Sequence, residues 1–148
     1  MPSFVVIVCL LLQSPAPASG QAVHAPHRFF DAVNISLTAM ETGALLADGY
    51  TTQRNLHDFG QLGREADPLA RPFVNAGWPG QIAGGALVVS ADVGLRYWLH
   101  KRGHHKAERL LPLVLTTYGL VGAIHNAREH ARFSRDYAII IKIGEIPR

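Results

Sequence analysis

The stretch that decides the fold is Gly77–His105, GWPGQIAGGALVVSADVGLRYWLHKRGHH. Trp78 and Trp98 are 20 positions apart. That separation is roughly 30 Å along an α-helix, the thickness of a hydrocarbon core. Tryptophan favours both membrane interfaces, and Lys101 and Arg102 follow in the headgroup zone. The stretch predicts a membrane-spanning helix, and the alternative is a helix buried in the core of a soluble protein.

A second apolar stretch follows, between Arg109 and Arg128. Residues 110–127 contain no Asp, Glu, Lys or Arg. At about 18 residues, this is near the shortest length that spans a bilayer. The overall composition is less informative, because 48% hydrophobic residues and a net charge of +3 suit a soluble protein as well. The sequence shows no interleaving of aromatic and basic residues, so we expect no nucleic-acid partner.

The N-terminus resembles a secretory signal. Residues 1–20 combine the apolar run VVIVCLLL with Ala16-Pro17-Ala18, which fits the small-residue pattern before a cleavage site. No Lys or Arg precedes the apolar run, so an uncleaved anchor is the alternative. Cys9 is the only cysteine, which excludes a disulfide framework.

The predicted fold class is all-α: a small membrane bundle of three helices after this signal-like segment. We expect a polar lead-in over 21–28, a helical membrane domain over 29–132, and a loose C-terminal tail over 133–148. The three helices are predicted over 29–53, 79–102 and 107–132. A short surface helix is expected after Asp67-Pro68, which reads as an N-cap and a first-turn proline.

The first helix carries a polar stripe on one face. Polar residues recur at three- and four-residue spacing, and the stripe comprises Asn34, Thr38, Glu41, Leu45, Asp48, Thr52 and Asn55. Glu41 alone costs roughly 3 kcal/mol on insertion scales, which about offsets the apolar residues of this helix. We therefore expect this helix to insert only with help from the other two, with its stripe facing the bundle.

Asp92 and Arg96 interrupt the apolar run of the second helix. Their four-residue spacing favours an ion pair within the helix, with Arg96 reaching toward the interface at Trp98. The alternative makes Asp92 a partner of the third helix. An antiparallel pairing of the second and third helices sets Asp92 level with Thr116 and Thr117.

The same levelling predicts a polar site at the opposite end of the bundle. His125 and Asn126 come level with Gly84 and Gly85, and Asp48 approaches the Trp78 end. Together with Asp92, the candidate polar site comprises Glu41, Asp48, Thr52, Glu65, His125 and Asn126. Two carboxylates and a histidine can bind a metal or pass a proton, or form a static hydrogen-bonded network. The sequence has no H-E-x-x-H, C-x-x-C or nucleophile motif, so we expect neither catalysis nor a cofactor.

Two further features concern partners. The loop HKRGHHKAER, residues 100–109, is predicted to be solvated and to touch anionic lipid headgroups. Its histidines, His100, His104 and His105, could bind a metal adventitiously. Gly80, Gly84 and Gly85 present a small-residue face that suits a second copy or another membrane helix, besides the bilayer itself.

The chain resembles a family of small, uncharacterised bacterial membrane proteins with three or four helices. The resemblance rests on ADGYTTQ at the end of the first helix, GREADPL in the connection, HKRGHHKAER, and IHN in the third helix. It covers about residues 30–130, and Asp67 stands where the family has Asn before Pro68. It implies a bacterial inner-membrane, multi-pass location and supplies no activity.

The sequence therefore predicts a small integral membrane protein with a structural or interaction role. The alternatives are a transporter-like or metal- or proton-binding membrane protein that uses the acid–histidine cluster, and a soluble periplasmic helical protein. Membrane orientation is left open. The total charge split places the loop 100–109 outside, whereas the density of charge in that loop places it inside.

Overall fold

The computed structural model describes residues 27–60 and 68–144, with side chains through residue 139. Four helices make up this part of the chain: α2 (Ala32–Phe59), α3 (Arg71–Asn75), α4 (Gly77–Lys101) and α5 (His105–Gly144). The described residues contain no strand, which confirms the all-α prediction. The predicted signal segment and Glu65 lie outside the described residues.

Local sequence signals set the ends of these helices. Asp31 caps α2, because its side chain accepts a hydrogen bond from the backbone N–H of Asn34 at 2.8 Å. Gly60 follows α2 at a φ of 54°. Gly103, at a φ of 76°, makes the tight turn between α4 and α5. Glycine adopts this left-handed backbone without the steric cost of a side chain.

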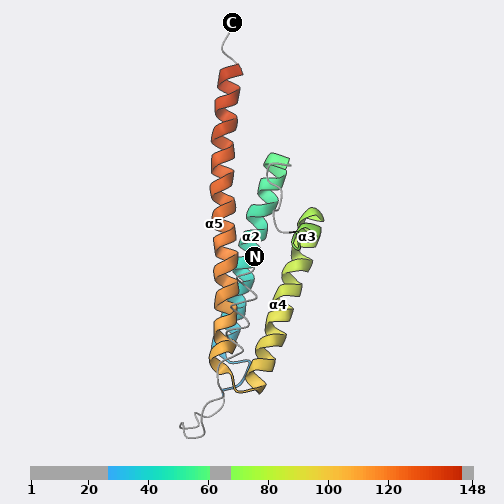
Figure 1. Ribbon diagram of the computed structural model, residues 1–148, viewed down its shortest axis with the longest axis vertical. Helices are drawn as coiled ribbons and strands as arrows, with labels where there is room; N and C mark the ends of the chain where they lie inside the picture. Colours follow the sequence, from blue (N-terminus) through green and yellow to red (C-terminus); the bar gives the residue numbers. More distant parts are fainter. Residues whose placement is uncertain (1–26, 61–67, 145–148) are drawn as a thin grey trace.

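The helices form an elongated bundle in which α2 and α5 run parallel and α4 runs antiparallel to both (Figure 1). α2 packs mainly against α5. Small residues permit the close approach: a Cβ on Gly119 would lie 3.0 Å from the backbone of Ala44, and one on Gly122 would lie 2.6 Å from Oδ1 of Asp48. The most extensive helix contact is therefore between the first and third predicted helices.

The glycine face predicted on α4 is filled within the chain. α3 lies across the N-terminal part of α4 (Figure 1). A Cβ on Gly80 would overlap the Phe73 carbonyl oxygen at 2.0 Å, and one on Gly84 would lie 3.0 Å from the Phe73 ring. Gly85 has no neighbouring atom within 4 Å of an added Cβ. Of the three glycines, only Gly85 leaves room for another helix.

Several helix boundaries differ from the predicted ones. α2 starts at Ala32 and continues to Phe59, six residues beyond the predicted end at Gln53. The third helix was predicted to end at Arg132, with a loose tail to follow, but α5 continues to Gly144. An extended tail would leave its backbone without hydrogen-bonding partners in the chain, whereas a helix satisfies its own backbone. The predicted short helix is present but begins at Arg71, so Ala70 is its N-cap and Pro72, not Pro68, is its first-turn proline.

The polarity of the bundle is reversed relative to a soluble protein. The side chains that are almost fully buried and largest are Arg96, Glu41, Glu108 and Pro112. Large apolar residues such as Leu87, Leu120 and Ile124 are exposed instead. α4 and α5 are each long and apolar enough to cross a membrane. α2, which carries the polar stripe, is not apolar enough to count as a candidate membrane span.

Candidate functional site

Three histidines and one glutamate meet at the end of the bundle where α4 turns into α5. Oε1 of Glu108 lies 3.2 Å from Nε2 of His27. Oε2 lies 3.0 Å from Nδ1 of His100 and 3.1 Å from Nδ1 of His105. The three rings stand edge to face, with centroids 4.7–5.1 Å apart. We call this group the histidine cluster.

Glu108 is the centre of the histidine cluster and has no solvent exposure. It lies in the first turn of α5, before the uncharged stretch that begins at Leu110. Burial raises the pKa of this carboxyl, but hydrogen bonds from His105, Asn34, His100 and His27 outweigh burial and leave the pKa at about 2. Glu108 is therefore an ionised acceptor surrounded by donors.

Asn34 links the histidine cluster to α2. Its side-chain amide donates to Oε1 of Glu108 and to the Phe29 carbonyl oxygen. Its side-chain oxygen accepts from Arg96 at 3.0 Å. Beside it, Asp31 accepts a hydrogen bond from the Asn34 backbone and pairs with Arg109 at 3.0 Å, and both interactions lower the pKa of Asp31. Through Asn34, these contacts hold the buried carboxylate of Glu108 in place, in addition to the contacts that the histidines make with it.

Arg96 connects all three long helices. Its guanidinium is 1% exposed and donates to Oδ2 of Asp92 at 3.3 Å, to the Thr38 hydroxyl at 2.8 Å, and to Asn34. The predicted Asp92–Arg96 pair is thus confirmed. The expectation that Arg96 reaches toward the interface is wrong, because polar groups of α2 and α5 satisfy it inside the bundle.

Pro112 explains one of these contacts. A proline within a helix lacks the N–H that would bond the carbonyl four residues earlier, which here belongs to Glu108. Nε of Arg96 donates to that carbonyl oxygen at 3.2 Å. The arginine thus satisfies an acceptor that the helix itself leaves open.

Glu41 lies deeper in the bundle beside Asp92. It is fully buried, and neither of its carboxylate oxygens meets a hydrogen-bond donor. Its charged neighbours are the carboxyl group of Asp92 and, through a weaker electrostatic interaction, the guanidinium of Arg96. Two carboxylates form a hydrogen bond only when one of them carries a proton. His125 and Asn126, which the candidate polar site predicted from the sequence groups with Glu41, do not hydrogen-bond to it.

Asp48, Thr52 and Asn126 form a second network nearer the other end. The Asn126 amide donates to Oδ1 of Asp48 and to the Thr52 hydroxyl, each at 2.9 Å. Its backbone carbonyl accepts from Asn55 at 2.9 Å. The structure therefore brings together three of the predicted site residues in a network that joins α2 to α5.

The other predicted site residues do not join this network. His125 lines a hollow with Gly84 and Gly85, as the antiparallel levelling predicted, and Asp48 lines the same hollow, but His125 belongs to no metal-ligating group of three or more side chains in the described part of the chain. Thr116 is buried, and its hydroxyl makes no hydrogen bond, so it does not relay one from Asp92. Glu41 and Asp92 form a separate pair. The single acid–histidine cluster predicted from Glu41, Asp48, Glu65 and His125 is not assembled by the described residues.

Sequence reasoning missed the roles of His27, Asn34 and Glu108. Glu108 belongs to the segment 100–109, which was predicted to be a solvated cationic loop. His100, His105 and Glu108 share an H-x4-H-x2-E spacing that could have indicated the cluster. Nothing in the sequence indicated that His27, about 80 residues away, would complete it, because its position depends on the packing of α2 against α5.

Comparison of the chain with protein-family models, with curated proteins and with solved structures found no match. The family resemblance drawn from the short motifs therefore stays a prediction. The candidate sites rest on their own geometry.

Proposed function

We propose that this chain is a small integral membrane protein with a structural or interaction role, located in the bacterial inner membrane. The observation that carries the proposal is the reversed polarity of the bundle. Only 17% of the apolar window of α4, and 28% of that of α5, is buried within the chain. In a soluble protein the core helices are mostly buried, and large exposed apolar surfaces mark an interaction site or a membrane. Lipid supplies the missing cover.

The polar interior supports the same proposal. In hydrocarbon, a polar side chain is stable only where the bundle provides its partner. Asn34, Thr52 and Arg96 are buried and hydrogen-bonded to other helices, and the buried Asp92 is paired with Arg96 within α4. α2 is the helix that depends most on these contacts. We propose that it joins the α4–α5 hairpin as a third span.

A proton-conducting role is less well supported. The buried groups form a continuous series from Glu41 through Asp92, Arg96 and Asn34 to Glu108. A proton relay needs groups that release and regain protons, whereas a guanidinium stays protonated in proteins. Arg96 therefore interrupts the series, and its five hydrogen bonds favour a fixed network.

One arrangement superficially resembles a catalytic triad. His130 lies 2.8 Å from Asp58 and 3.3 Å from the Ser134 hydroxyl. The Ser134 hydroxyl, however, donates to the His130 backbone carbonyl at 2.8 Å. The surrounding N–H groups belong to the interior of α5 and make helical hydrogen bonds, so they cannot form an oxyanion hole. These three residues connect α2 to α5 on an exposed surface.

Alkaline carbonate extraction, with reporter fusions at the α4–α5 turn and at the C-terminus, tests the membrane proposal. We expect the chain to stay in the membrane fraction. The two reporters should lie on opposite sides, because α5 alone separates them. Release of the chain by carbonate would contradict the proposal, as would two reporters on the same side.

The interaction role has its own test. In a Cys9→Ser background, Gly85→Cys and Gly94→Cys each place a thiol on α4 where no atom lies within 4 Å of the new Cβ. We expect oxidation in native membranes to crosslink the Gly85→Cys chain to a second copy, and the Gly94→Cys control to crosslink less. Equal crosslinking of the two variants would show random collision. A strictly monomeric chain without any crosslinked partner would count against an interaction role.

A further inference from the structure

We propose that the histidine cluster is a binding site for a divalent first-row transition metal, with His27, His100, His105 and Glu108 as its ligands. One ligand atom from each residue can be chosen so that all four lie within 4.8 Å of one another. The sequence indicated only adventitious metal binding by His100, His104 and His105, whereas His27 and Glu108 complete the group and His104 lies outside it. The existence of the site does not depend on the membrane proposal.

The distances within the cluster are close to those of a metal site. With metal–ligand bonds of about 2.0–2.1 Å, the ligand atoms of a tetrahedral zinc site lie about 3.3 Å apart. Oε1 of Glu108 lies 3.2 Å from the His27 nitrogen, and Oε2 lies 3.0 and 3.1 Å from those of His100 and His105. The four ligand atoms, one from each residue, lie within 4.8 Å of one another, so side-chain rotations must draw the more distant ones together around an ion.

The ligand types select the class of metal. Imidazole nitrogens with one carboxylate suit Zn²⁺ and its neighbours among the transition metals, whereas Mg²⁺ and Ca²⁺ prefer a shell of oxygens. The single charge of Glu108 partly neutralises a divalent ion. Binding requires each ligating nitrogen to be free of its proton, which a neutral imidazole achieves by carrying that proton on its other nitrogen.

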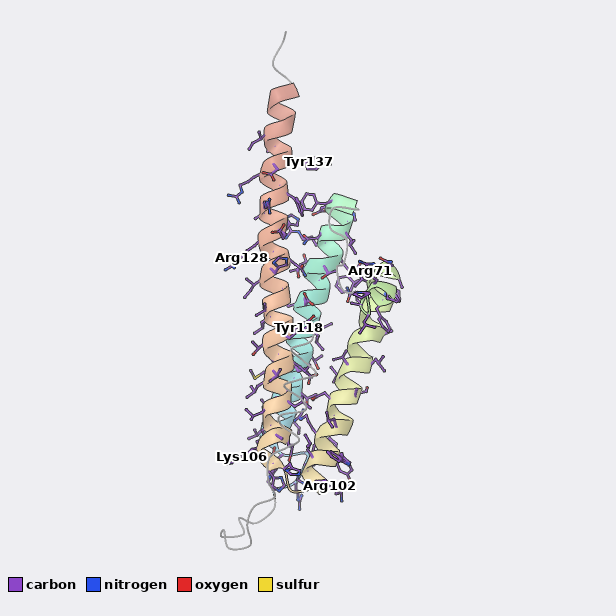
Figure 2. The ribbon with its side chains drawn as sticks, viewed as in Figure 1. Arg71, Arg102, Lys106, Tyr118, Arg128 and Tyr137 are labelled. Atoms are coloured by element: carbon purple, nitrogen blue, oxygen red, sulfur yellow. The ribbon has the colours of Figure 1, made fainter. Side chains whose placement is uncertain are left out.

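Of the cations near the site, Arg96 is buried and paired with Asp92, and two others lie over aromatic rings. Lys101 lies over the Tyr97 ring at 5.5 Å, and Arg102 lies over the Trp98 ring at 5.1 Å. Figure 2 shows Arg102 and Lys106 on the outside of this end of the bundle. Screening by solvent weakens the repulsion between such exposed charges and a bound ion.

The supporting contacts hold the ligands in place before an ion arrives. Asn34 bonds the Glu108 carboxylate, and Arg96 bonds both Asn34 and the Glu108 backbone. The turn at Gly103 places His100 and His105 on the same side of the hairpin. Such contacts around metal ligands commonly change affinity by 10- to 100-fold when removed. The side chains of His27 and His105 are 23% and 39% exposed, which leaves the ion a route from solvent.

An ion at this site would fasten three parts of the chain. His27 precedes α2, His100 ends α4, and His105 and Glu108 begin α5. The metal would therefore fix the segment before α2 to the turn of the hairpin. We expect binding to stabilise the folded bundle, because an ion that binds only the folded state shifts the folding equilibrium toward that state.

The test uses the full chain, purified in detergent without a histidine tag and stripped of metal. Zn²⁺ affinity is measured by competition with a chromophoric chelator, and Co²⁺ reports geometry through its visible absorption. We expect one ion per chain and the intense Co²⁺ bands of a four-coordinate site. His27→Gln and His105→Gln should each lower Zn²⁺ affinity at least tenfold. Excess Mg²⁺ should not compete.

His104→Gln is the matched control, because His104 lies in the same loop but outside the cluster. It should leave Zn²⁺ affinity unchanged. A loss equal to that of His105→Gln would show adventitious binding by the loop and overturn the proposal. Zn²⁺ should also raise the unfolding temperature of the wild type and His104→Gln, but raise that of His27→Gln much less. Equal increases in all three would exclude His27 as a ligand, even if a variant folds less well.

Discussion

Replacing Arg96 by methionine is expected to destabilise the bundle strongly. The substitution keeps most of the side-chain volume but removes five hydrogen bonds and leaves Asp92 without its cation. Breaking a buried ion pair by removing one partner costs about 3–5 kcal/mol. Asp92 can escape by taking up a proton, which from an ordinary aspartate pKa of about 3.9 costs about 4 kcal/mol at pH 7. The two values agree, so we expect a loss of about 4 kcal/mol.

The same reasoning gives a pH dependence. The cost of protonating an aspartate falls by about 1.36 kcal/mol for each pH unit. At pH 5 the loss caused by Arg96→Met should therefore be about 2.7 kcal/mol smaller than at pH 7. In the double variant Asp92→Leu/Arg96→Met, this dependence should be absent, and much of the stability should return, because an apolar pair often replaces a buried ion pair without loss.

Unfolding in mixed detergent micelles, followed by circular dichroism, measures these free energies. Arg102→Met is the matched control, because the guanidinium of Arg102 lies over the exposed ring of Trp98 and over no other described aromatic ring. Its loss should not exceed about 1 kcal/mol. If Arg96→Met and Arg102→Met cost the same, or if the cost of Arg96→Met were the same at pH 5 and pH 7, the assignment of Arg96 as the buried partner of Asp92 would be refuted.

Four further substitutions test other contacts by the same unfolding measurement. Gly119→Ala should destabilise the bundle by about 1–2 kcal/mol, because the new Cβ meets the backbone of α2 at 3.0 Å. Gly94→Ala, which places its Cβ in open space, should stabilise the bundle by up to about 1 kcal/mol. If Gly119→Ala were instead the more stable of the two variants, the close packing of α2 against α5 would be contradicted. Glu41→Gln should change stability by less than about 1 kcal/mol, since an amide can donate to Asp92 without a shared proton. A loss above about 3 kcal/mol would show that Glu41 is an ion-pair partner of Arg96, and would contradict this expectation. Asp31→Ala should cost about 1 kcal/mol at pH 7 through the lost N-cap. The pKa of Asp31 is lowered in the folded chain. The stability that ionised Asp31 contributes is therefore present above the unfolded aspartate pKa and is lost as the pH falls through the folded value. If the stability difference between wild type and Asp31→Ala persisted undiminished at pH 2, ionised Asp31 would not be its cause.

Periodicity predicted most of the helical architecture. Trp78 and Trp98 bracket an α4 close to its predicted bounds, and the polar stripe of α2 is buried at Asn34, Glu41, Thr52 and Asn55 as expected. Spacing within a helix is a local property, so the sequence displays it directly.

Contacts between helices were predicted less well. The glycines of α4 indicated close packing, but which helix fills that face depends on the position of α3 after the connection. The partners of Glu41 were misassigned for a similar reason. The position of a residue along the bundle axis can be estimated from the helical rise per residue. The direction in which its side chain points depends on how the helix is rotated about its own axis, which a single sequence does not fix.

The reliance of α2 on α5 has a consequence for biosynthesis. Asn34 bonds Glu108 from 74 positions earlier in the chain. At a translation rate of about 5–20 residues per second, the ribosome needs roughly 4–15 seconds to make that stretch. During this interval α2 has been synthesised, but the side chains of α5 that hydrogen-bond to its polar stripe have not. In the proposed membrane setting, the order of insertion would then be reversed relative to the order of synthesis: the later hairpin enters first, and the earlier helix waits at the translocation machinery or at the membrane surface until its partners arrive.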